Sequence, residues 1–139
     1  GFDCLRDAAA LDAARERALH TLGQVGLADR VGVAAKGLSY GDRRALEIGV
    51  ALAGDPKLLF LDEPTAGLGA DGIVRVADLV RSLRGKVTMV IIEHDMRFLF
   101  SLADRISVVH WGQVIARGTP AELRANPWVQ RSNLGALAA

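Results

Sequence analysis

The feature that most constrains this chain is a short apolar run, LLFL, that ends in two adjacent carboxylates, Asp62 and Glu63. Pro56 and Pro64 bound the run, and within it apolar and polar residues do not alternate. This pattern predicts a central strand of a parallel sheet, buried on both faces. Because open α/β sheets bind ligands beyond the carboxyl ends of their strands, such a strand would deliver Asp62 and Glu63 to a site. A strand end that merely starts a turn is the alternative that this run alone leaves open.

Two further segments flank this strand in the sequence. Upstream, Leu38-Ser39-Tyr40-Gly41-Asp42 opens a predicted helix, and downstream a second apolar run ends in Glu93-His94-Asp95. With Ser39, Asp62 and His94 in this order and at these spacings, the chain resembles the ATP-binding cassette (ABC) ATPases. In that family a signature motif precedes the aspartate of the Walker B strand, and a switch histidine follows the next strand.

Several short segments narrow the resemblance to the ATPase subunits of branched-chain amino acid and urea-type importers. They are Leu38 to Gly41, Glu47-Ile48, Ile92 to Met96, and Asn133-Leu134-Gly135. One family element is absent, because no GxxxxGK[ST] phosphate loop occurs in the sequence. The resemblance implies an α/β fold that is part of a P-loop NTPase, with a mostly parallel sheet, flanking helices and part of the helical subdomain. Residues 1–54 would belong to the helical subdomain and residues 55–139 to the C-terminal part of the catalytic core.

The resemblance also implies roles for individual residues. Asp62 would hold Mg²⁺, a cation that takes oxygen ligands, and Glu63 would be the general base for the attacking water. His94 would orient that water beside the γ-phosphate. The signature would contact nucleotide bound by a second ATPase subunit; its residues are Leu38, Ser39, Tyr40, Gly41 and Asp42. A loop would connect the two nucleotide sites of the dimer; its residues are Ala66, Gly67, Leu68 and Gly69. ATP and Mg²⁺ are thus the implied ligands, and both require the absent phosphate loop.

Two positions depart from the family pattern. Asp42 replaces the usual glutamine, and Gly69 stands where the connecting loop more often has Asp or Asn. A carboxylate at position 42 would lie near the partner's γ-phosphate, and we expect it to face Arg43 or Arg44 instead. Ser39 would also serve as an ordinary N-cap with Asp42 as its capping-box partner, and this role is compatible with nucleotide contact.

Composition restricts the classes of function. The 139 residues with 50% hydrophobic content suit one core, and no apolar run approaches the roughly eighteen residues that span a bilayer. With 17 basic and 16 acidic residues, the net charge of +1 gives no reason to expect nucleic acid as a partner. Cys4 is the only cysteine, which excludes an intrachain disulfide and favours a reducing compartment. The segment after Gly1 lacks the pattern of a signal peptide.

Periodicity predicts the elements around these motifs. A helix from about Asp3 to Val25 carries an apolar stripe (Leu11, Ala14, Ala18, Leu22 and Val25) that we interpret as core, although a partner-facing surface would show the same pattern. Strands and helices then alternate, which favours parallel pairing, until a hairpin near Trp111. The expected ranges are strands 58–61, 87–92, 106–109 and 113–116, and helices 70–83, 96–103 and 120–124, with a further short helix from Asn126.

Two functions follow from these observations. The first is the ATPase subunit of an importer for branched-chain amino acids or a related solute, cytoplasmic and peripheral on the inner face of the cell membrane. Its partners would be a second ATPase subunit, permease subunits and, indirectly, a solute-binding protein. The second is a nucleotide-independent assembly module with no activity of its own. This segment alone should not hydrolyse ATP, and its unprotected strand edge predicts an oligomer.

Overall fold

The computed structural model describes residues 4–127 and residue 129, and it divides into two compact units, residues 1–91 and residues 92–139. The α-helices and strands of the first unit are α1 (Cys4–Gln24), α2 (Tyr40–Leu52), β1 (Leu58–Asp62), α3 (Ala70–Leu83) and β2 (Thr88–Ile92), whose last residue lies across the division. Two short 3-10 helices, η1 (Ala28–Arg30) and η2 (Ala35–Gly37), lie between α1 and α2. None of the described helices is long and apolar enough to cross a membrane.

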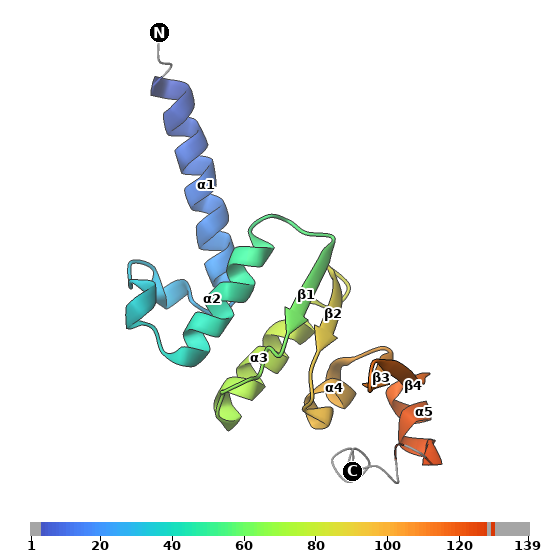
Figure 1. Ribbon diagram of the computed structural model, residues 1–139. Coiled ribbons are helices and arrows are strands. Elements are labelled where there is room, and N and C mark those ends of the chain that lie inside the picture. Colours follow the sequence, from blue (N-terminus) through green and yellow to red (C-terminus); the bar gives the residue numbers. More distant parts are fainter. Residues whose placement is uncertain (1–3, 128, 130–139) are drawn as a thin grey trace. The chain divides into compact units, whose positions relative to one another are not determined.

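The strands β1 and β2 pair in a two-stranded sheet and run in the same direction, joined by α3 (Figure 1). The amide of Thr88, the first residue of β2, donates to the carbonyl of Lys57, just ahead of β1, at 3.1 Å. The helix α3 buries one apolar stripe that includes Val76, Val80 and Leu83. The predicted strand-helix-strand order with parallel pairing is therefore confirmed in this unit.

The prediction that the first strand is buried on both faces is wrong. Leu59 and Leu61 are buried, but Leu58 and Phe60 on the opposite face are 47% and 66% exposed. Val90 of β2 is also 40% exposed. The sequence of β1 is continuously apolar because both faces of the strand are suited to burial. The described part of the chain covers only one of these two faces. An apolar sheet face is consequently left open to solvent.

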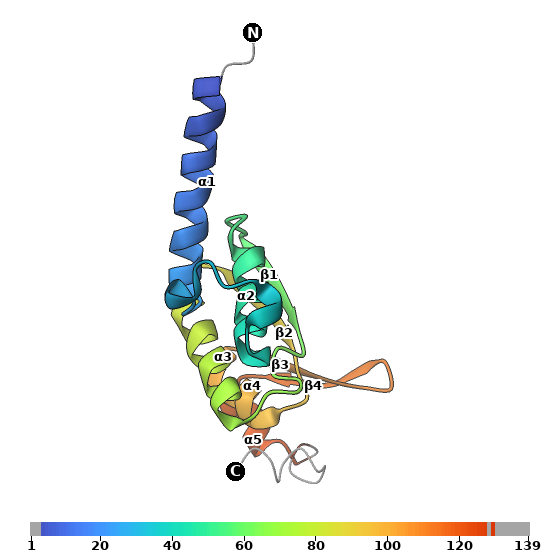
Figure 2. The ribbon, with the colours of Figure 1, turned by 90° about the vertical axis from the view of Figure 1, so that its left-hand side faces the viewer.

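The interpretation of the α1 stripe as core is also wrong for most of its length. Leu11 is 70% exposed and Ala14 and Ala18 are exposed, whereas only the end of the helix and the turn after it are buried, at Thr21 and Val25. Figures 1 and 2 show α1 extending beyond the rest of the first unit. Residues 10–20 of this helix are all exposed, and the alternative of a partner-facing surface stays a prediction.

The second unit contains α4 (Met96–Leu102), β3 (Ile106–His110), β4 (Gln113–Gly118) and α5 (Pro120–Ala125). The strands β3 and β4 form the predicted hairpin, antiparallel with Ile106 opposite Gly118 and His110 opposite Gln113 (Figure 2). Trp111 and Gly112 make its turn with φ of +49° and +73°. The described residues Pro127 and Val129 are helical, as expected after Asn126, while Asn133-Leu134-Gly135 lies outside the described residues.

Candidate functional site

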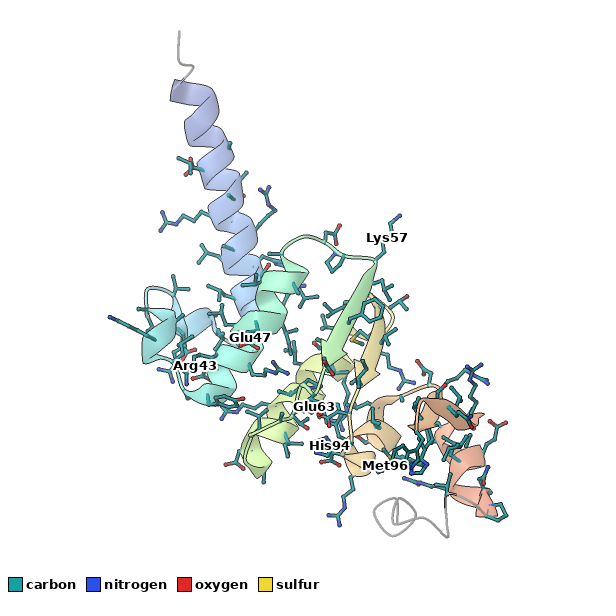
Figure 3. All side chains as sticks on the ribbon, viewed as in Figure 1. Arg43, Glu47, Lys57, Glu63, His94 and Met96 are labelled. Carbon is teal, nitrogen blue, oxygen red and sulfur yellow. The ribbon has the colours of Figure 1, made fainter. Side chains whose placement is uncertain are left out.

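The two carboxylates emerge where the sequence predicted them, at the carboxyl end of β1. Asp62 is the last residue of the strand, and Glu63 follows with a left-handed φ of +44° (Figure 3). The backbone then turns tightly, because the amide of Ala66 donates to the carbonyl of Glu63 and that of Leu68 to Thr65, both at 3.1 Å. The side chain of Asp62 is exposed, so an approaching ligand can reach it.

The signature begins α2 as expected. Ser39 is the N-cap, and its Oγ accepts a hydrogen bond from the amide of Asp42 at 3.1 Å. Tyr40 packs against Gly67, where a Cβ would lie only 3.3 Å from the tyrosine ring. A Cβ on Gly41 would lie 3.9 Å from Leu68. The signature and the loop that follows β1 therefore touch each other within the first unit.

The partner of Asp42 differs from the prediction. Its carboxylate lies 3.5 Å from the guanidinium of Arg75 on α3, and the Asp42 side chain is only 17% exposed. Arg43 instead lies over the ring of Tyr40, and Arg44 pairs with Glu47 at 2.7 Å. The expectation that Asp42 faces Arg43 or Arg44 is wrong, because these two arginines contact Tyr40 and Glu47 instead. The charge of Asp42 is nevertheless balanced by an arginine.

Gly69 occupies the N-cap of α3 with an extended backbone, φ −73° and ψ 173°, and makes no side-chain cap. A Cβ there would meet nothing within 4 Å. The position could thus hold the Asp or Asn that is common in the family, and glycine leaves the helix start without a capping side chain.

Sequence reasoning missed the contact of Arg44 with the end of β1. From α2 this side chain donates hydrogen bonds to the backbone carbonyls of Asp62, Glu63 and Pro64, at 2.8, 2.7 and 3.3 Å. Its only sequence signal is the spacing to Glu47 on the same helix face, which predicts a surface ion pair and nothing about the strand end.

His94 belongs to the second unit. In the sequence it lies between the end of β2 and the start of α4 (Figure 3). The carboxylate of Glu93 accepts the amides of His94 and Asp95 at 2.9 and 3.2 Å and lies 3.7 Å from Nδ1 of His94. Asp95 caps α4 by accepting the amide of Phe98 at 3.1 Å. This local network fixes the backbone at His94, whose side chain is 78% exposed.

The residues present fit a magnesium ion brought by a nucleotide. Asp62 offers an exposed carboxylate at a strand end, and no group of three or more His, Cys, Asp or Glu that could hold a metal occurs among the described residues. Mg²⁺ commonly uses one or two carboxylates together with waters and substrate phosphates, rather than an all-protein cage. The Asp62 carboxylate is thus a donor suited to Mg²⁺ that is held together with phosphate.

Comparisons with known proteins agree with this geometry. A family model described as ABC transporter matches residues 5–66. The chain is 41% identical over 124 residues to the high-affinity branched-chain amino acid transport ATP-binding protein LivG of Salmonella typhimurium, covering 88% of this chain and 49% of that protein. It is 45% identical over 113 residues to the daunorubicin resistance ATP-binding protein DrrA3 of Streptomyces coeruleorubidus, covering 81% of this chain and 36% of that protein.

A solved structure shares the fold. The ADP conformation of MJ1267, an ATP-binding cassette of an ABC transporter, matches with a TM-score of 0.77 and 30% identity over 84% of this chain and 48% of that one. The chain belongs to the ABC ATPase family and has part of its P-loop NTPase fold. It spans about half the length of the curated relatives it matches.

Proposed function

We propose that this chain contributes the acceptor part of a composite ATP site in the ATPase subunit of an ABC importer, for branched-chain amino acids or a related small solute. The observation that carries the proposal is the contact, within the first unit, between the signature and loop 66–69, which follows the turn after β1. The resemblance to LivG over most of the chain supports the solute class.

Each residue has a chemical role in this proposal. Asp62 holds Mg²⁺, which supplies charge neutralisation at the phosphates when bound, and Glu63 takes the proton of the attacking water. His94 orients that water by donating toward the γ-phosphate. Ser39 and the free amides at the start of α2 meet the nucleotide of a second subunit, since a helix N-terminus favours an anion. Loop 66–69 links the two sites.

The proposed partners follow from the same family. They are a second ATPase subunit, the permease subunits and, indirectly, a solute-binding protein, which places the protein on the cytoplasmic face of the membrane. Residues 1–54 form part of the helical subdomain and residues 55–139 part of the catalytic core. The exposed outer turns of α1 offer a surface for such a partner.

The competing function is an assembly module that acts without nucleotide. Steady-state ATP hydrolysis by the full-length protein that the gene encodes separates the two, because only the first function requires Mg²⁺ and turnover. We expect hydrolysis that depends on Mg²⁺, and we expect Asp62→Asn to raise the Mg²⁺ concentration required for half-maximal rate. A wild-type protein that neither binds nor hydrolyses ATP would favour the assembly module.

A further inference from the structure

The Arg44 side chain lies between two parts of the candidate site. It originates on α2, two residues after Asp42 at the end of the signature, and reaches the turn that carries Asp62 and Glu63. We propose that Arg44 is a positioning residue, which fixes the backbone of that turn and thereby the direction of the Glu63 carboxylate. The inference deepens the proposed function and rests on it for its catalytic consequence.

Hydrogen bonds engage almost all the N–H donors of the Arg44 guanidinium. Nη2 donates to the carbonyls of Asp62 and Glu63 at 2.8 and 2.7 Å, and Nε donates to that of Pro64 at 3.3 Å. Nη1 donates to the Glu47 carboxylate at 2.7 Å. A guanidinium has five N–H donors in a rigid plane, so four of them have identified acceptors here. Such an arrangement restricts both the arginine and the three carbonyls.

The turn after β1 contains a strained residue, Glu63, which requires stabilising contacts such as those of Arg44. Glu63 has a left-handed φ of +44°, which is unfavourable for a residue with a Cβ and persists only where surrounding contacts over-determine it. Its carbonyl accepts from the Ala66 amide as well as from Arg44, so two donors hold the peptide after the strained residue. Arg44 is therefore one of the contacts that keep Glu63 in this conformation.

Lysine could not replace this function. Its ammonium is a single point with three donors, whereas the carbonyls here are reached from two nitrogens of a planar fork. Glu47 accepts from Nη1 of the guanidinium, whereas the carbonyls of the turn accept from Nη2 and Nε. Losing Glu47 should hence disturb the turn much less than losing the fork.

The consequence for function is a direct link between the signature helix and the general base. A displacement of α2 on nucleotide binding would move Arg44 and with it the carbonyls on either side of Glu63. Arg44 does not need to touch nucleotide for this effect, so its removal should lower turnover while leaving ATP affinity nearly unchanged.

The test compares Arg44→Lys with Glu47→Gln and with Arg81→Lys, a matched arginine that pairs only with Asp78 on α3 among the described contacts. In the full-length protein we expect Arg44→Lys to reduce kcat by at least roughly tenfold with KM for ATP within about twofold, as expected for a misplaced catalytic group. Glu47→Gln and Arg81→Lys should stay within about threefold of wild type in kcat. Equal kcat values for Arg44→Lys and Arg81→Lys would overturn the inference.

Hydrogen exchange of the same proteins gives a readout that is independent of turnover. Arg44→Lys should speed exchange of the amides of Ala66 and Leu68, which close the turn, while the control variants should not. Unchanged exchange at both amides in Arg44→Lys would overturn the inference even if the wild type hydrolyses ATP. If the wild type does not hydrolyse ATP, the proposed function fails, and the exchange result still decides whether Arg44 positions the turn.

Discussion

At the scale of single residues, long-range arginine contacts define the site more than the motifs alone do. Arg75 neutralises Asp42 from a position 33 residues later in the chain, at 3.5 Å. Arg44 reaches the β1 turn over 18 to 20 residues. Neither contact follows from periodicity or from a short motif, because both depend on how helices pack after folding. The positions of Ser39 at a helix start and of Asp62 and Glu63 at a strand end could be predicted, because they depend on local sequence.

The pair of Asp42 and Arg75 gives a prediction for nucleotide affinity. Arg75→Ala should weaken ATP binding by the full-length protein, because an unbalanced carboxylate would then lie beside an incoming phosphate. Adding Asp42→Gln should restore the affinity. The stability cost of either change should stay below about 1 kcal/mol, since Arg75 is largely exposed.

Isothermal titration with a non-hydrolysable ATP analogue measures these affinities. Arg81→Ala, which breaks a surface pair on the same helix, is the control and should bind like wild type. If Arg75→Ala binds as tightly as wild type, the charge of Asp42 does not matter for nucleotide.

At the scale of elements, the order of the α-helices and strands could be predicted, and their boundaries to within two residues, since the turn residues and caps are local signals. The helix α3 (Ala70–Leu83) has the predicted range, and α5 begins where it was predicted, with Thr119 and Glu122 forming a capping box. Burial could not be predicted in the same way, because the open faces of β1 and α1 depend on what lies opposite them. An apolar stripe in the sequence indicates that a surface is suited to burial, but it does not indicate which residues cover that surface.

The capping box of α5 predicts a dependence of stability on pH. The Thr119 amide donates to the Glu122 carboxylate at 2.7 Å, and this bond, with help from the Thr119 side chain and Arg105, holds the pKa of Glu122 below its ordinary value. A lowered pKa means that the carboxylate stabilises the folded state above its unfolded pKa and loses this effect as the pH falls through its folded pKa.

Thermal unfolding of wild type and Glu122→Gln at a series of pH values measures this effect. We expect wild type to be the more stable at neutral pH and the difference to shrink on acidification through the lowered pKa. A difference that stays constant over this range would show that the box does not depend on the ionised carboxylate.

At the scale of the whole molecule, the open sheet face predicts association. Leu58, Phe60 and Val90 present apolar surface on one side of β1 and β2, and apolar strand surfaces recruit partners or aggregate. The 139-residue chain by itself should therefore be oligomeric in light scattering. Phe60→Thr should reduce the average mass, and Val74→Ala, on the exposed side of α3, should not. A monodisperse monomer for the wild type would contradict this prediction.

The most direct measurement for the whole account is ATP turnover by the full-length protein with Glu63→Gln. The substitution keeps the size and hydrogen-bonding ability of the side chain but removes the base, so the account predicts that Mg²⁺-ATP still binds while turnover falls by roughly 10²- to 10⁴-fold. A Glu63→Gln protein that hydrolyses ATP at the wild-type rate would contradict the assignment of the β1 carboxylates to the chemistry.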